Sequence, residues 1–180
     1  MVNIITAILL ILFAALSRLI PHPPNFAPIV AIALFSGVYL DKKYAFIVPI
    51  IAMLISDAII GFHSGMIWVY GSFVIIAFLG LWLKSRKSAA GSKKFGYIFG
   101  TALVSSVIFF IITNFGVWTS GFYGLDFKGL VECYAMAIPF FKNSVAGDVF
   151  YVALMFGIYE IVKYYAPKEV LSENKIHPEK

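Results

Sequence analysis

The sequence predicts an all-helical membrane protein, a bundle of six transmembrane helices, and three observations support this prediction. Of the 180 residues, 61% are hydrophobic and only 13% are charged, whereas a soluble domain carries about 25% charged residues. The mean hydropathy is +0.92. The apolar residues form several runs close to the roughly 20 residues that a helix needs to cross a membrane. Open sheets cannot span lipid and the alternation of a β-barrel is absent, so we interpret the runs as helices and exclude a soluble globule or a disordered chain.

The first two helices are expected at residues 2–20 and 24–40, joined by a stiff loop. Three prolines between residues 21 and 24 end the first helix, because proline donates no amide hydrogen bond and disfavours a helical residue before it. The first helix lacks the basic start and the small-residue cleavage site of a signal peptide, so we expect it to be retained. Asn25 is a candidate cap for the second helix.

Four further spans complete the predicted bundle, at residues 44–62, 67–83, 95–117 and 144–163. The apolar stretch 129–141 is too short for a span, contains Glu132 and includes Pro139 near its end. We expect a separate interfacial or re-entrant helix there. Residues 1–167 then form a single transmembrane domain, and residues 168–180 form a cytoplasmic tail.

The positive charges predict the direction of the spans. With six spans, both termini and the loops 41–43 and 84–94 share one side, which carries 11 of the Lys and Arg residues. The opposite side carries three, Arg18, Lys128 and Lys142. The positive-inside rule therefore predicts that both termini lie in the cytoplasm. Topology explains the net charge of +5, and we expect no nucleic acid as a partner.

Charged residues that are uncommon in a membrane span gather near the predicted outer ends of the helices. An intramembrane carboxylate costs roughly 2.5–3.5 kcal/mol and usually faces the bundle interior, which makes Asp57 and Asp148 candidates for substrate binding, together with Arg18. Structural alternatives stay open for all three: a hydrogen bond between helices for Asp57, a helix dipole for Asp148, and snorkelling to the interface for Arg18.

Uncharged residues on the same side extend the candidate substrate-binding site. Asn25 lies in the proline-rich loop, and Asn114 lies near the outer end of the fifth span. Trp118 and Tyr123 belong to the glycine-rich aromatic loop 118–127, which is long enough to fold over a cavity and to stack on a planar ligand. For the aromatic residues, an interfacial aromatic belt is the alternative interpretation. For the proline-rich loop, the alternative is a purely structural role.

Catalytic and metal-binding motifs are absent from the sequence. It contains no G-x-S-x-G, no H-E-x-x-H and no phosphate-binding loop, and the single Cys133 excludes an intramolecular disulfide and a CxxC metal site. We therefore expect no catalytic residue, no metal, no cofactor and no enzyme. Any energy drawn from a nucleotide must then come from a partner protein.

The chain resembles a widespread family of small, uncharacterised bacterial membrane proteins. The resemblance is carried by SRLIPHPPNFAPIVAIALFSG (Ser17–Gly37), ITNFGVW (Ile112–Trp118) and IPFFKNSVAGDVFY (Ile138–Tyr151). Together these segments are distributed over most of the chain. The resemblance implies a multi-pass protein of the bacterial cytoplasmic membrane and does not by itself name a substrate.

That family is distantly similar to the substrate-binding S-components of energy-coupling factor (ECF) vitamin transporters. The shared features are the six-helix count, the cytoplasmic termini and the string SDAIIG (Ser56–Gly61), which Gly65, Gly71 and Gly80 follow. The similarity implies a high-affinity binder of a vitamin-like nutrient that docks onto a T-component carrying two ATPase subunits. The first helix departs from that pattern, because its alanines form no Ala-x-x-x-Ala pair.

The leading hypothesis for function is a membrane subunit that binds a small nutrient in an outer-leaflet pocket and works with an ATP-driven module. Asp57 and Asp148 would bind hydrogen-bond donors or a cationic ring, so the carboxylates favour a neutral or cationic ligand. One alternative is a scaffold or assembly protein similar to MreD, whose polar residues hold helices together. Another is a solitary transporter coupled to an ion gradient.

Overall fold

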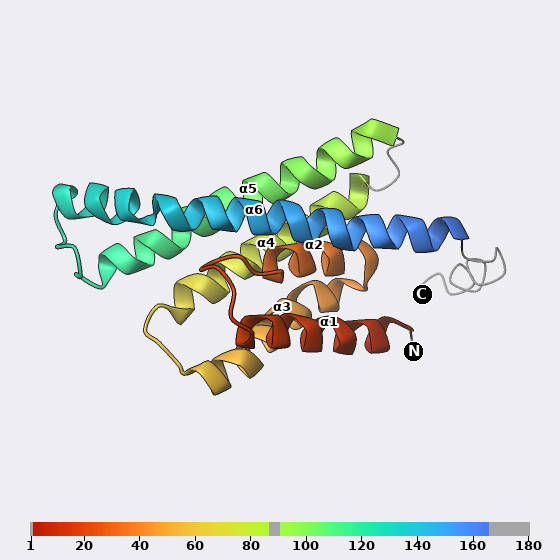
Figure 1. Ribbon diagram of the computed structural model, residues 1–180, viewed down its shortest axis with the longest axis horizontal. Coiled ribbons are helices and arrows are strands. Elements are labelled where there is room, and N and C mark those ends of the chain that lie inside the picture. Colours follow the sequence, from red (N-terminus) through yellow and green to blue (C-terminus); the bar gives the residue numbers. More distant parts are fainter. Residues whose placement is uncertain (1, 87–90, 166–180) are drawn as a thin grey trace.

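A computed structural model describes residues 2–86 and 91–165, and all regular structure in these two ranges is α-helical. The elements are α1 (Val2–Leu19), α2 (Ile29–Tyr39), α3 (Lys42–Ile60), α4 (Met66–Arg86), α5 (Gly91–Thr119) and α6 (Phe127–Tyr165) (Figure 1). Within the described ranges, the last four are long and apolar enough to cross a membrane, whereas α1 and α2 are shorter apolar helices. The chain is therefore a multi-pass helical membrane protein, as its hydropathy predicts.

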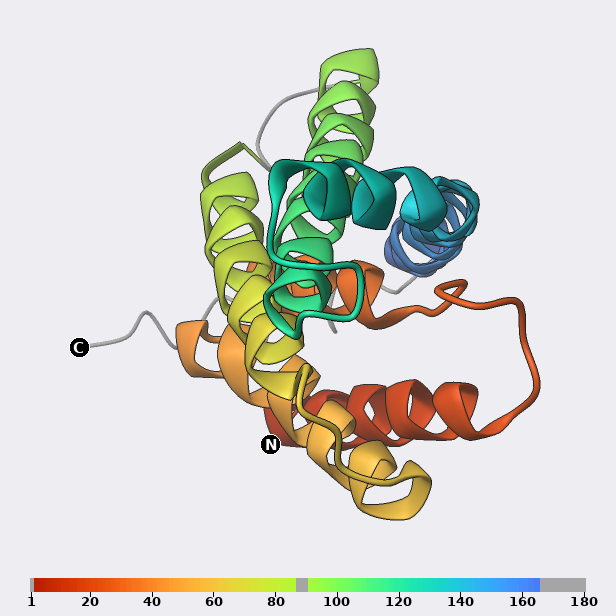
Figure 2. The ribbon, with the colours of Figure 1, turned by 90° about the vertical axis from the view of Figure 1, so that its left-hand side faces the viewer.

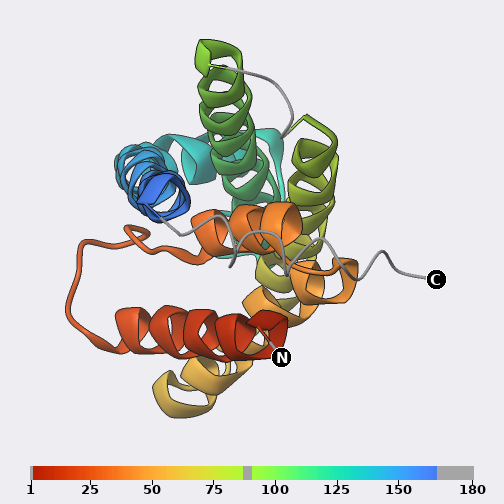
Figure 3. The ribbon, with the colours of Figure 1, turned by 90° about the vertical axis from the view of Figure 1, so that its right-hand side faces the viewer.

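Successive helices run back and forth along the long axis of the bundle. The start of α1 and the end of α6 lie at the same end (Figures 1 and 3). The connections from α1 to α2, from α3 to α4 and from α5 to α6 lie at the other end, which we call the loop end (Figure 1). The first helix therefore begins, and the last helix ends, at the same end of the bundle.

The short helix α2 lies in the middle of the bundle, in contact with α3, α4 and α6 (Figure 3). Its residues from Ile29 to Val38 are all buried. With 11 residues, it spans roughly 16 Å, about half of the hydrocarbon core. The expected helix 24–40 thus begins five residues late, because the prolines exclude a helical start and Pro28 takes the N-cap position. Asn25 adopts a left-handed conformation (φ 64°) in the loop, and no side chain caps α2.

Two glycines let α2 and α4 approach closely. A Cβ atom on Gly37 would lie 2.6 Å from the carbonyl carbon of Gly80, and a Cβ on Gly80 would lie 3.0 Å from the carbonyl oxygen of Ala33. Small residues at such crossings allow backbones to pack directly, which drives helix association in lipid. The central position of α2 therefore depends on these two glycines.

The helix α1 packs on α3 and leaves its other face open. Ala7 and Ala14 are buried, whereas Leu9, Leu12 and Leu16 are about half exposed, as expected for side chains that face lipid. The contact with α3 places the last turn of α1 beside the last turns of α3, which brings Arg18 to the site described below.

The long helix α6 corrects one expectation. Residues 129–141 and 144–163 were expected to form two helices, but a single helix of 39 residues runs from Phe127 to Tyr165 with Pro139 inside it. Figure 2 shows its first turns (teal) crossing the view while the remainder (blue) is seen nearly end-on. Proline removes one backbone hydrogen bond and clashes with the carbonyl four residues earlier, so a helix can bend there without ending.

The extra length carries the α5–α6 connection away from the bundle. Thirty-nine residues correspond to roughly 58 Å along the helix path, well above a 30 Å core. Asp126 fixes the start of α6 by accepting a hydrogen bond from the Gly129 amide at 2.7 Å. The hairpin of α5 and α6 therefore projects beyond the other helices at the loop end (Figure 1). The expected tail 168–180 lies outside the described residues.

Candidate functional site

A cavity of about 410 Å³ opens at the loop end, above the start of α2. All six helices contribute to it, together with the α1–α2 loop and the α3–α4 loop. Its polar lining residues are Arg18, His22, Asn25, His63, Ser144 and Asp148. Its apolar lining residues are Ala27, Ile29, Val30, Met53, Ile60, Val69, Phe73 and Phe109. Cavities that bind small molecules have this size and this mixture of an apolar wall with a few polar groups.

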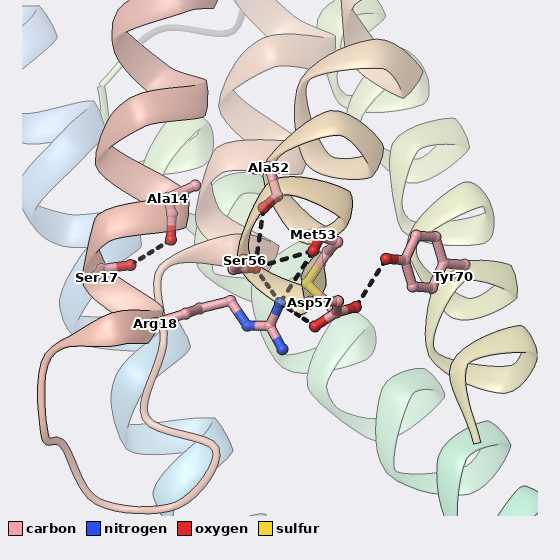
Figure 4. Close-up of polar contacts among 8 residues, drawn as sticks. All are labelled: Ala14, Ser17, Arg18, Ala52, Met53, Ser56, Asp57 and Tyr70. Atoms are coloured by element: carbon pink, nitrogen blue, oxygen red, sulfur yellow. Dashed lines mark hydrogen bonds and ion pairs between the residues drawn. The ribbon is translucent and has the colours of Figure 1, made fainter. Parts of the chain in front are cut away.

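The guanidinium of Arg18 is held beside the cavity by an ion pair with Asp57 (Figure 4). Arg18 Nη1 lies 2.7 Å from Asp57 Oδ1 and also donates to the Ser56 hydroxyl. The Tyr70 hydroxyl donates to the second carboxylate oxygen, Oδ2, at 2.7 Å. Residues of α1, α3 and α4 are therefore joined by one polar cluster in an apolar bundle.

Asp57 is engaged by this cluster and does not line the cavity. Its side chain is 1% exposed, whereas that of Arg18 is 18% exposed. Both carboxylate oxygens have protein partners. The interhelical hydrogen-bond interpretation therefore describes Asp57 in this structure, and the residue acts on the cavity through the arginine that it orients.

Asp148 of α6 approaches the cavity from the opposite side of the bundle. It is 3% exposed, and its Oδ2 accepts a hydrogen bond from the Ser106 hydroxyl of α5 at 2.6 Å. Its other oxygen, Oδ1, has no hydrogen-bond donor among the described residues. The one fully enclosed side-chain oxygen or nitrogen without a partner in the described ranges is Ser36 Oγ, so Asp148 Oδ1 is accessible from the cavity.

Asn25 is the third predicted site residue at the cavity, and it lies in the α1–α2 loop beside His22. The loop makes a turn in which the Phe26 amide donates to the Pro23 carbonyl at 3.0 Å. Figure 2 shows the loop passing outside the bundle from α1 to α2. The loop borders the cavity through His22, Asn25 and Ala27.

The remaining three predicted site residues lie away from the cavity. Asn114 donates to the Phe110 carbonyl of its own helix at 2.7 Å. Trp118 donates through Nε1 to the Asp126 carbonyl at 3.3 Å, and Tyr123 packs against Phe122 with ring centroids 5.0 Å apart. The aromatic loop closes the projecting hairpin, so it does not cover the cavity.

Several residues that form the cavity or hold its side chains were missed by sequence reasoning. Ser106, the partner of Asp148, lies beside Ser105 in the largely apolar middle of α5, and that pair was a usable signal. Phe73 and Phe109, whose ring centroids are 5.4 Å apart, carry no signal that distinguishes them from other apolar residues. Among the described residues, no group of three or more His, Cys, Asp or Glu side chains is placed to hold a metal ion.

Comparison with known proteins identifies one family. A family model described as a family of unknown function, DUF6580, matches residues 1–170. No curated protein and no solved structure matches the chain. The match covers all six helices and every residue that lines the cavity.

Proposed function

The chain belongs to the DUF6580 family of unknown function, and we propose that it binds a small, vitamin-like nutrient in the cavity as the substrate-binding subunit of an uptake system. The observation that carries this proposal is a cavity of about 410 Å³ to which all six helices contribute. Two charged side chains, Arg18 and Asp148, present unused hydrogen-bonding atoms to it. A buried charged group is costly in a membrane and marks functional sites there.

The loop end would face the outside of a bacterial cytoplasmic membrane, with both termini in the cytoplasm. The excess of positive charge on the side of the termini supports this orientation. Since the chain has no nucleotide-binding motif, transport would require an energising partner, a T-component with two ATPase subunits. The projecting α5–α6 hairpin and the lipid-facing side of α1 are the surfaces left open for such a partner.

A scaffold similar to MreD explains the Arg18–Asp57 pair equally well, because buried polar contacts hold helices together. It does not explain why Asp148 keeps a free oxygen at the wall of a cavity. A solitary ion-coupled carrier would use Asp148 as a proton-binding group, and its transport would then continue in cells that lack the energising module.

The test is mass spectrometry of the full chain purified in mild detergent from its native host, compared with Asp148→Asn. We expect the wild type to retain a small molecule and to co-purify with ATPase subunits, and Asp148→Asn to lose the small molecule alone. Asp126→Asn is the matched control, since Asp126 caps α6 outside the cavity and asparagine caps helices equally well. An empty cavity in the wild type, with cell-wall assembly proteins bound, would refute the proposal in favour of a scaffold.

A further inference from the structure

Arg18 offers hydrogen-bond donors at one side of the cavity, which we call the donor pole. Within the described residues, all polar contacts of its guanidinium are made by one nitrogen, Nη1, which binds Asp57, Ser56 and the Met53 carbonyl. The other two nitrogens, Nη2 and Nε, have no hydrogen-bond or ion-pair partner among the described residues. A guanidinium edge with two parallel N–H groups matches the geometry of a carboxylate. The protein therefore holds the guanidinium of Arg18 through Nη1, whereas the edge formed by Nη2 and Nε is free to bind a ligand.

The start of α2 adds to the donor pole. Ile29 and Val30 line the cavity, and the first amides of a helix have no partner within it. No side chain caps this end of α2. The partial positive charge of the helix end then favours an anionic group at the same side of the cavity as Arg18. It supplements the arginine and would not define a site alone.

Asp148 forms an acceptor pole on α6. Its Oδ2 is fixed by Ser106, and its free Oδ1 is accessible from the cavity. A carboxylate that is 3% exposed and has only one protein donor gains most from a charged donor, because charge-assisted hydrogen bonds are the strong ones. An ammonium group meets this requirement.

Most of the remaining cavity wall is apolar. Val30, Met53, Val69, Phe73 and Phe109 contribute to it, whereas His22, Asn25, His63 and Ser144 are its only other polar lining residues among those described. The body of the ligand that fits is therefore largely hydrocarbon or an aromatic ring. Since Arg18 pairs with Asp57 at 2.7 Å, the carboxylate of Asp57 is screened and repels an anionic group less than the sequence alone suggested.

From this arrangement we infer that the ligand is an apolar zwitterion, with a carboxylate bound at Arg18 and an ammonium bound at Asp148. This inference rests on the proposed function and specifies its substrate class. It differs from the expectation of a neutral or cationic ligand, which assumed that Asp57 and Asp148 both face the substrate.

The test is calorimetric titration of the full chain in detergent after dialysis against ligand-free buffer. The probes are leucine, phenylalanine and straight ω-amino acids of increasing chain length, each beside its carboxamide, which lacks the carboxylate, and its N-acetyl derivative, which lacks the ammonium. We expect at least one zwitterion to bind about tenfold to a hundredfold tighter than both of its derivatives.

Two variants test which residue binds which charged group of the ligand. Asp148→Asn should bring the affinity ratio of the zwitterion to its N-acetyl derivative close to one. Arg18→Lys keeps a positive charge beside Asp57 but loses the open edge, so it should bring the ratio of the zwitterion to its carboxamide close to one. Asp126→Asn is the control and should leave both ratios at the wild-type value.

The inference is overturned if a derivative binds as tightly as its parent or if no zwitterion binds. The mass spectrometry described above then separates two cases. A co-purified small molecule that Asp148→Asn loses would keep the proposed function with another ligand class. An empty wild-type cavity would remove both the function and the inference.

Discussion

Arg18 and Asp57 form an ion pair of 2.7 Å that joins the last turn of α1 to the last turn of α3. The pair lies between two packed helices at the side of the cavity, with Asp57 buried and Arg18 reaching the cavity wall. Because the carboxylate occupies only one nitrogen of the guanidinium, the same contact stabilises the bundle and orients the free edge of the arginine. Stability and binding are therefore coupled at this residue.

The first prediction concerns this pair. Asp57→Asn is expected to lower the free energy of unfolding by about 3–5 kcal/mol, since it leaves a largely buried guanidinium without its counter-charge. The measurement is unfolding of the purified protein in detergent micelles, monitored by circular dichroism. The double variant Arg18→Gln, Asp57→Asn removes both charges and should recover part of the loss. A single variant as stable as the wild type would show that the pair has no structural role.

The second prediction concerns the crossing of α2 and α4. Gly37→Ala should lower stability by at least about 1–3 kcal/mol, the usual cost of overpacking, because its Cβ would overlap the backbone of Gly80. Gly71→Ala is the matched control on α4, where an added Cβ meets nothing within 4 Å. Gel filtration after heating gives the temperature at which each variant loses its monodisperse peak. Equal temperatures for the two variants would contradict the close packing.

The sequence predicts the helical class and the common end of the termini, because hydropathy and charge depend only on position along the chain. It does not predict the joined helix α6. Pro139 was interpreted as a helix end, yet a proline within a helix that continues on both sides produces a bend instead. The late start of α2 at Ile29 is also an effect of proline, but with the opposite result. Several prolines close together prevent a helix and leave a loop.

The candidate site, like the fold, could be predicted only in part from the sequence. Arg18 and Asp148 were identified because ionisable residues are conspicuous in apolar segments. Asn114 was selected for its position along the fifth helix, but that position does not give the direction around the helix, which turns once every 3.6 residues. Trp118 was misplaced because the length of α6 moves its loop beyond the bundle. Sequence position therefore predicts how far along the bundle a residue lies, whereas helix packing decides which side chains are in contact.

The third prediction concerns the other end of α2. Lys84 Nζ donates to the Leu40 carbonyl at 3.0 Å, where the last carbonyls of a helix have no partner within it and favour a cation. Lys84→Met keeps the apolar stem and loses the hydrogen bond, so stability should fall by about 0.5–1.5 kcal/mol. Lys42→Met is the control, since Lys42 is exposed. Chemical denaturation in micelles measures both, and an equal effect of the two variants would contradict the capping role of Lys84.

The fourth prediction separates the cavity from the aromatic loop. Phe109 lines the cavity, so Phe109→Leu should weaken binding roughly fivefold through loss of about 1 kcal/mol of apolar contact. Trp118 lies on the projecting hairpin and donates to Asp126, so Trp118→Phe should leave the affinity unchanged. Calorimetric titration with the tightest zwitterion of the panel measures both variants. If Trp118→Phe weakens binding while Phe109→Leu does not, the ligand lies under the α5–α6 loop, and Arg18 and Asp148 are not its poles.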